Sequence, residues 1–250
     1  MKRVQVNNII FGESGTKICV PLIGASDKQI LSDIEKLNDY DFDLIELRTD
    51  CYERIEYFSD VRLLLENIRK IYSGTILFTF RTKNEGGMRE LSEEKYFELY
   101  NYIIGSKLID LIDVELFRQE KYIKKTIASA HEKGVRVLMS SHDFIKTPSA
   151  DEIVKRLVMM QEYDADITKI AVMANCEEDV LTLLSASLEM KKEKADRPFV
   201  ALSMGPLGIV TRLSGELFGS CLTFAALNAP SAPGQINAGN ARKILNMLSM

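Results

Sequence analysis

The sequence contains no tryptophan, and it has only two histidines, four cysteines and six prolines among its 250 residues. The cysteines lie far apart and form no C-x-x-C pair, a spacing that argues against a zinc site and against a secreted disulfide framework. We therefore expect reduced, buried thiols. No apolar run is long enough to cross a bilayer, and the start MKRVQVNNIIFGESG lacks the apolar core of a signal peptide. These absences favour the reducing cytoplasm and no membrane partner.

The sequence also lacks an excess of positive charge. Its formal net charge of −4 provides no basic field for nucleic acid, so we expect a small molecule as the partner. An anionic ligand would need a local cluster of arginine or lysine. Hydrophobic residues make up 46% of the chain and charged residues 27%, which is typical of a sizeable core under a charged surface.

Short apolar runs alternate with longer amphipathic segments, at a period close to the roughly 30 residues of a βα unit. The predicted strands are residues 17–24, 42–48, 75–81, 108–115, 135–141, 167–172, 199–203 and 221–225. The predicted helices include residues 57–72, 121–133, 150–162 and 177–194. Asp27, Ser92 and Ser149 stand where helix N-caps belong, and Gly134 stands where a helix should stop.

Eight such units favour a closed parallel barrel over an open sheet. The turn after the first strand, PLIGASDK, has no G-x-G-x-x-G pattern, which argues against a dinucleotide-binding fold. We therefore predict an α/β protein, a (β/α)8 TIM barrel with residues 1–250 as one catalytic domain. The residues before Lys17 alternate and then turn, so we expect a short β-hairpin that closes the barrel floor.

Polar side chains recur at the ends of successive predicted strands. Because side chains alternate across a strand, the apolar set can pack under the helices while the charged set faces the barrel axis. The expected inward set is Glu46, Arg48, Arg81, Asp113, Glu115, Ser140, His142 and Lys169. Barrel enzymes place their chemistry at this end of the strands. An internal salt-bridge network closing the barrel mouth is the alternative, although so many buried charges are costly unless a site uses them.

Lys169 and His142 are the most informative members of this set. Lys169 interrupts the apolar run ITKIAVM, which fits either an ion-paired lysine or a Schiff-base amine. Burial and a nearby Arg48 or Arg81 would lower its pKa. His142 ends the preceding strand, close enough to meet Lys169 over one substrate and to exchange a proton. His131, the other histidine, is expected to be solvated near a helix end.

Six segments, in order, resemble type I 3-dehydroquinate dehydratases. They are ELR (46–48), FRTKNEGG (80–87), SSHDF (140–144), TKIAVMA (168–174), SMGPLGIVTR (203–212) and APSAPGQ (229–235). The resemblance runs from about residue 17 to the C-terminus, and SSHDF together with TKIAVMA carries most of its specificity.

The resemblance implies a lyase of the shikimate route that needs no cofactor or metal and forms a homodimer or a larger homo-oligomer. Lys169 would form an imine with the C3 ketone of 3-dehydroquinate. His142 would remove the C2 proton and then protonate the departing C1 hydroxyl, a syn loss of water. Glu85 matches the acidic residue that orients and polarises this histidine.

The resemblance also implies a set of substrate-binding residues. Arg212 would pair with the substrate carboxylate, and a lid carrying Ser231 and Gln235 would close over the ligand. The ring hydroxyls would be bound, and the charge around Lys169 adjusted, by Glu46, Arg48 and Arg81. The apolar wall would come from Met204 and Phe224.

Two alternatives stay open at this point. One is another imine-forming barrel lyase such as a class I aldolase, because Gly205, Gly208 and Gly234 fall where phosphate-binding barrels place glycines. The other is a barrel that binds a small carboxylate without catalysis. The arginine and the proline-rich lid favour a carboxylate over a phosphate, and the pair His142 and Lys169 favours an enzyme.

Overall fold

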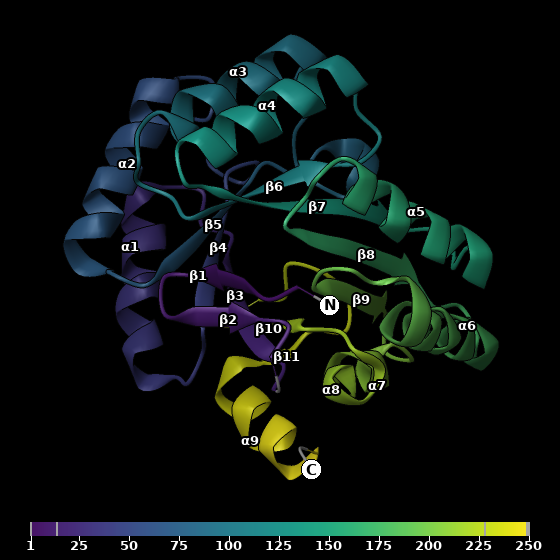
Figure 1. The fold of residues 1–250 in the computed structure, drawn as a ribbon. Coiled ribbons are helices and arrows are strands. Elements are labelled where there is room, and N and C mark those ends of the chain that lie inside the picture. The colour runs from purple at the N-terminus through teal and green to yellow at the C-terminus, as the bar shows by residue number, and fades with distance from the viewer. Residues whose placement is uncertain (1, 14, 228, 249–250) are drawn as a thin grey trace.

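The computed structural model describes residues 2–13, 15–227 and 229–248. Eight of the nine parallel strands of the main sheet curl into a barrel with helices outside, and the first seven of them pair in chain order (Figure 1). The eight barrel strands are β3 (Lys17–Leu22), β4 (Leu44–Arg48), β5 (Thr75–Thr79), β6 (Leu111–Glu115), β7 (Arg136–Asp143), β8 (Ile167–Met173), β9 (Phe199–Met204) and β10 (Leu222–Ala226). The ninth, β11 (Ile236–Asn237), is a short strand that pairs with the eighth barrel strand. That eighth strand, β10, also pairs with β3, and a bridge between Phe199 and Ser220 links β9 to the start of β10. The predicted (β/α)8 barrel is confirmed.

Each predicted strand exists, but some begin later than the sequence pattern indicated. β4, β6 and β8 each start directly after an aspartate: Asp43, Asp110 and Asp166. Each carboxylate accepts a hydrogen bond of 2.7–2.8 Å from a backbone N–H of the preceding strand. The side chain of each aspartate therefore serves as a hydrogen-bond acceptor for the neighbouring strand.

The helices follow the expected alternation with the strands. They are α1 (Asp27–Lys36), α2 (Phe58–Ile71), α3 (Glu93–Ile104), α4 (Glu120–Glu132), α5 (Ala150–Glu162), α6 (Glu177–Glu189), α7 (Ile209–Leu213), α8 (Gly215–Phe218) and α9 (Ala238–Leu248). Short turns of helix occur at η1 (Leu37–Asp39), η2 (Lys83–Glu85) and η3 (Met190–Lys194). In the part of the chain described, no helix is long and apolar enough to span a membrane.

The helix ends match the sequence signals with two exceptions. Ser92 and Ser149 accept hydrogen bonds from the first helical turns, and Gly134 follows α4 at φ +77°. The prediction for Asp27 was wrong: Ser26 is the N-cap residue, and the Asp27 carboxylate accepts a hydrogen bond from the Tyr52 hydroxyl at 2.6 Å. The predicted helix over residues 177–194 ends at Glu189, because its last five residues widen into the π-turn η3.

The predicted N-terminal hairpin is present as β1 (Val4–Val6) and β2 (Ile9–Phe11), and in Figure 1 it lies across the middle of the strand ring. Its apolar side chains pack against the lowest inward layer of the barrel, which is Leu44, Leu77, Leu111, Leu138, Ile167 and Val200. In the turn, Asn7 donates a hydrogen bond to Asp110 at 2.9 Å. The hairpin therefore fills the floor, and the polar residues are left at the opposite end.

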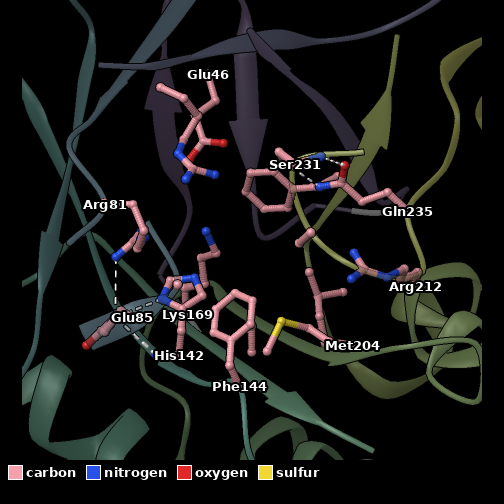
Figure 2. Close-up of a pocket in the computed structure, with 16 residues that line it drawn as sticks. Glu46, Arg81, Glu85, His142, Phe144, Lys169, Met204, Arg212, Ser231 and Gln235 are labelled. Carbon is pink, nitrogen blue, oxygen red and sulfur yellow. Dashed lines mark hydrogen bonds and ion pairs between the residues drawn. The ribbon is translucent and has the colours of Figure 1, made fainter. Parts of the chain in front are cut away.

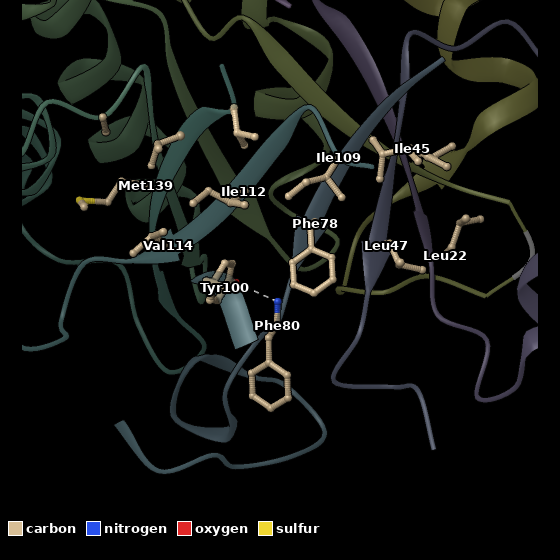
Figure 3. Close-up of a cluster of buried hydrophobic side chains, with 14 of the residues drawn as sticks. Leu22, Ile45, Leu47, Phe78, Phe80, Tyr100, Ile109, Ile112, Val114 and Met139 are labelled. Carbon is tan, nitrogen blue, oxygen red and sulfur yellow. Dashed lines mark hydrogen bonds between the residues drawn. The ribbon is translucent and has the colours of Figure 1, made fainter. Parts of the chain in front are cut away.

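The larger core lies between the strands and the helices. In β4 the outward side chains Ile45 and Leu47 join it, whereas Glu46 and Arg48 face the interior (Figure 3). The Tyr100 hydroxyl of α3 ties the end of β5 to β6, because it accepts from the Phe80 N–H and donates to the Asp113 carbonyl. All four cysteines are free, but Cys51 and Cys176 are only half-buried.

Candidate active site

A pocket lies at the carboxyl ends of the strands. It brings together all eleven candidate residues of the sequence: Glu46, Arg48, Arg81, Glu85, His142, Lys169, Met204, Arg212, Phe224, Ser231 and Gln235. They come from five barrel strands, from the helix α7 and from loops at the strand ends, up to 189 residues apart in the chain (235 minus 46). Only a closed barrel mouth collects such distant residues.

Lys169 projects from β8 into this pocket with 5% of its surface exposed. Its Nζ lies 3.5 Å from Asp113 Oδ2 and 4.2 Å from the centre of the Phe224 ring. Lys169 is therefore paired with a carboxylate of β6. Arg48 and Arg81, the positive charges expected near it, line the same pocket. Phe224 contributes the wall as expected and also lies against the ammonium.

His142 lies on β7, one strand before Lys169 and two residues beyond the pairing of Ser140 with Lys169. Its Nδ1 is 2.8 Å from Glu85 Oε2. The same oxygen accepts from the His142 backbone N–H at 3.1 Å and from Arg81 Nη1 at 3.3 Å. Because two of its partners are obligate donors, Oε2 acts as an acceptor, and we assign the Nδ1–H tautomer on this basis. Nε2 then carries the free lone pair.

The electrostatics of this pair favour a neutral imidazole. Burial lowers the pKa of His142 well below its usual value, and Arg81, Lys169 and Arg48 lower it further. Burial, with Glu115 as the next cause, raises the pKa of Glu85 to about 8. At neutral pH the histidine is therefore an uncharged base held in place by a carboxyl group.

Arg81 is committed to neighbouring side chains. Its Nη2 donates to Asp113 at 2.6 Å, and its Nη1 contacts Glu115, Glu85 and the Ser140 hydroxyl at 3.1, 3.3 and 2.9 Å. The internal salt-bridge network considered from the sequence is thus real for this residue. It coexists with the pocket, since the same network positions Glu85 and the partner of Lys169.

Arg48 and Glu46 of β4 also line the pocket. Arg48 Nε and Nη2 donate to the two oxygens of Asp50 at 2.9 and 3.0 Å. Glu46 accepts from the Thr79 hydroxyl at 2.9 Å. Both side chains are therefore held in fixed positions on β4, with polar atoms at the pocket surface.

Arg212 differs from the other arginines of the pocket. It lies on α7 with 2% of its surface exposed, and no acidic side chain pairs with it in the described part of the chain. Its Nη2 donates to the Pro233 carbonyl at 3.0 Å, whereas its Nε has no partner. Burial lowers its pKa to about 10. A buried guanidinium with spare donors is a site for an anion.

Residues 229–235 lie over the pocket beside Arg212. The Ser231 N–H donates to Gln235 Oε1, and Gln235 Nε2 donates to the Ser231 hydroxyl, both at 2.9 Å. Figure 2 shows these two side chains above the space that Lys169, His142 and Arg212 face. The segment is in the position expected of a lid.

The pocket contains residues that the sequence reasoning did not single out, namely Gly86, Phe144, Ala171, Leu202 and Ala232. Gly86 has φ +83°, and a Cβ there would approach the Phe144 ring to 2.2 Å. A glycine is therefore needed for Phe144 to cover the loop that carries Glu85. The signal was available, because both residues lie inside the quoted segments FRTKNEGG and SSHDF.

His131 lies outside the site, in the last turn of α4 as expected, but it is only partly exposed to solvent. It is half-buried, and its Nε2 lies 2.9 Å from the Asp166 carboxylate at the start of β8. No group of three or more His, Cys, Asp or Glu within the described ranges has an arrangement that could hold a metal ion.

Comparison with known proteins gives consistent matches. The family model for type I 3-dehydroquinase matches residues 18–250. The chain is 47% identical to a 3-dehydroquinate dehydratase of Syntrophotalea carbinolica, over 100% of this chain and 99% of that one. A crystal structure of type I 3-dehydroquinate dehydratase from Clostridium difficile, covalently modified by comenic acid, superposes with a TM-score of 0.95 at 47% identity, covering 99% of this chain and 97% of that one. A 3-hexulose-6-phosphate synthase, 16% identical with a TM-score of 0.61 and coverage of 94% and 100%, shares the fold alone.

Proposed function

Because the chain belongs to the type I 3-dehydroquinase family, we propose that its pocket dehydrates 3-dehydroquinate to 3-dehydroshikimate through an imine on Lys169. The observation that carries this proposal is the arrangement in Figure 2. A buried lysine and a neutral histidine face one cavity, and an arginine that has no acidic partner among the described residues faces it from the other side. A small ring with a ketone and a carboxylate fits these groups.

The first step uses the amine of Lys169. Its neutral form attacks the C3 ketone, and uptake of one proton with loss of water gives a protonated imine. The later hydrolysis of the imine releases that proton again. Asp113, 3.5 Å from Nζ, supplies a negative charge that stabilises this cation. The imine draws electrons from the neighbouring C2–H bond and acidifies it.

The second step uses His142. Its Nε2 takes the C2 proton, and the electrons of that bond flow to the imine nitrogen as an enamine. When the enamine returns its electrons, the C1–O bond breaks and the proton on Nε2 leaves with the hydroxyl as water. A second water then hydrolyses the conjugated imine and frees Lys169. Glu85 holds the ring so that Nε2 serves as both base and acid.

The remaining candidates bind the substrate. Arg212 pairs with the carboxylate through its spare donors, and Ser231 and Gln235 contact the ring from the lid. Glu46, Arg48 and Arg81 bind the ring hydroxyls and adjust the charge around Lys169. Met204 and Phe224 form the apolar wall.

Borohydride trapping tests this function. Treating the protein with 3-dehydroquinate and borohydride should leave a stable adduct on Lys169, located by mass spectrometry, and ultraviolet absorption should report the conjugated product. Lys169→Ala should abolish both turnover and trapping while the fold survives, because Asp113 keeps Arg81 at 2.6 Å as a partner of opposite charge. Substantial turnover by a Lys169→Ala preparation free of host enzyme would contradict the imine mechanism.

The alternative of a class I aldolase loses its support, since the family match spans residues 18–250 and the sugar-phosphate barrel shares the fold alone. A sugar phosphate in the trapping assay is the direct comparison and should give no adduct. The alternative of a non-catalytic carboxylate-binding barrel predicts no ultraviolet product.

Type I 3-dehydroquinase function implies a place in the shikimate pathway and so in aromatic amino-acid biosynthesis. We further propose that residues 1–250 act as one catalytic domain, that the protein is cytoplasmic, and that two copies form a homodimer. Family resemblance supports the homodimer, and light scattering of the purified protein tests it: a mass near twice 28.3 kDa is expected, and a mass near 28.3 kDa would contradict it.

A further inference from the structure

One backbone oxygen joins the anion site to the lid. The Pro233 carbonyl accepts hydrogen bonds from Arg212 Nη2 at 3.0 Å and from the Gly205 N–H at 3.2 Å. Gly205 directly follows β9, and Arg212 lies on the short helix after it. The loop after β9 therefore holds the lid through a single acceptor.

Gly234 makes this contact sterically possible. It adopts φ +79°, and a Cβ built on it would lie 2.3 Å from the Gly205 carbonyl oxygen and 3.0 Å from the Gly205 carbonyl carbon. Both obstructing atoms belong to the backbone, so a side chain cannot be accommodated by a rotamer change. Any residue larger than glycine must lift the lid away from the loop that carries Arg212.

The guanidinium of Arg212 has capacity left for an anion while it holds the lid. One donor of Nη2 is used by Pro233, whereas Nε is buried without a partner, and no carboxylate neutralises the group in the described part of the structure. A carboxylate bound at the spare donors would fix the plane of the guanidinium. Fixing that plane strengthens the bond to Pro233, because hydrogen bonds depend steeply on their angle.

We propose that Pro233 and Gly234 form a latch through which the substrate carboxylate on Arg212 closes the lid, so that the chain selects carboxylate-bearing rings by closure as well as by charge. The latch rests on the proposed function only in assigning the carboxylate to Arg212. Linkage makes it reciprocal: a ligand that tightens the lid must bind more weakly when the lid is propped open.

A matched pair of ligands separates the latch from the chemistry. Shikimate has the ring carboxylate but no ketone, so it cannot form an imine with Lys169, and its methyl ester lacks the negative charge. Their dissociation constants would be measured by calorimetry on the wild type and on Gly234→Ala. The control is Gly134→Ala, which has a similar backbone angle of φ +77° but nothing within 4 Å of its added Cβ.

Gly234→Ala should weaken shikimate binding by about 5- to 150-fold, the usual range of coupling between sites, and should weaken the ester much less. Gly134→Ala should leave both constants unchanged. Equal losses for the two ligands would overturn the latch and leave Gly234 as a pocket wall. No loss for either ligand would overturn it as well.

A second measurement needs no variant. In the wild type, hydrogen exchange at the amides of residues 231, 232, 234 and 235 should slow with shikimate and change little with the ester. Equal protection by both ligands, or by neither, would also refute the latch. Failure of the proposed function would instead appear as missing adduct on Lys169 with 3-dehydroquinate, whatever the lid does.

Discussion

At the scale of single residues, Glu85 Oε2 links the histidine to the charged interior of the barrel. It accepts from the His142 ring, from the His142 backbone and from Arg81. The backbone contact holds the carboxyl at a fixed position along β7, and the ring contact selects the tautomer. Because three donors already bind this oxygen, Glu85 can orient His142 without accepting the proton that Nε2 must return to the substrate.

His142→Ala should separate imine formation from elimination. The variant keeps Lys169, so an imine of intact substrate should accumulate and appear as a mass increase on the protein, whereas the wild type should show mainly the dehydrated adduct. General acid–base catalysis is worth about 10²–10⁴-fold, and turnover should fall by at least that factor. Near wild-type turnover would mean that another group is the base. Absence of any adduct would mean that His142 is also needed for condensation.

The raised pKa of Glu85 predicts a pH dependence of the rate. Below its pKa of about 8 the carboxyl is protonated and polarises His142 weakly, and above it the carboxylate increases the basicity of Nε2. The kcat of the wild type should therefore rise as the pH increases through about 8. Glu85→Gln keeps an oxygen acceptor but cannot ionise, so its profile should lack this rise. An unchanged rise in Glu85→Gln would assign it to a different group.

At the scale of elements, the two ends of the barrel have different tasks. The hairpin β1–β2 fills the floor with apolar side chains, and the opposite end has its charged residues and the lid. The aspartates before β4, β6 and β8 bind the N–H groups of neighbouring strands near the floor. Stability at one end and chemistry at the other is the usual division in this fold.

Phe11→Ala tests this division. Phe11 is fully buried in the floor cluster, so its truncation should cost about 3–5 kcal/mol in the free energy of unfolding, measured with urea. At urea concentrations well below the unfolding transition, the kcat of the variant should stay near the wild-type value. Ile10→Ala is the control on the same strand, because Ile10 is only half-buried and should cost less. A large loss of kcat with unchanged stability would show that floor and site are not independent.

At the scale of the whole molecule, a charge network crosses three strands of the barrel. Arg81 of the β5 end contacts Asp113 and Glu115 of β6, and Glu115 also binds Arg118 at 2.9 Å. Burial alone would raise the pKa of Asp113, but Arg81 and Lys169 hold it below its usual value. Arg81, Asp113, Glu115 and Lys169 stay charged in the interior because each has a partner of opposite charge.

Arg81→Met should therefore destabilise the barrel by about 3–5 kcal/mol at pH 8, because it leaves buried carboxylates without their cation. Without Arg81 the pKa values of these carboxylates rise in the folded state, so the folded variant takes up protons more readily than the unfolded chain as the pH falls. The deficit in Tm should consequently shrink between pH 8 and pH 5. Arg62→Met removes an exposed pair with Glu66 and should change Tm little at either pH. A deficit that is constant with pH would contradict the network as its source.

The sequence by itself determined the barrel and the membership of the site. Short apolar runs at a regular spacing predicted all eight strands, and period-two alternation predicted the inward face of five of them, β4 to β8. Lys169 stood out because a lysine breaks an apolar strand. Alternation is a local property of the backbone, so it can be read without knowing what lies across the barrel. Helix ends were less certain: Asp27 has the chemistry of a cap, but its carboxylate binds Tyr52 from the next βα unit.

Only the tertiary structure decided how the site residues are paired. The carboxylate paired with Lys169 is Asp113, 56 residues earlier in the chain (169 minus 113). His131 is paired with Asp166. Arg212 does not belong to any strand pattern in the sequence, and in the described structure its buried guanidinium has no acidic partner. These pairings depend on distances across a closed ring of strands, which barrel closure and side-chain packing set together. The same closure brings the Pro233 carbonyl to Arg212 and Gly234 against Gly205, contacts between segments that have no periodic pattern of their own.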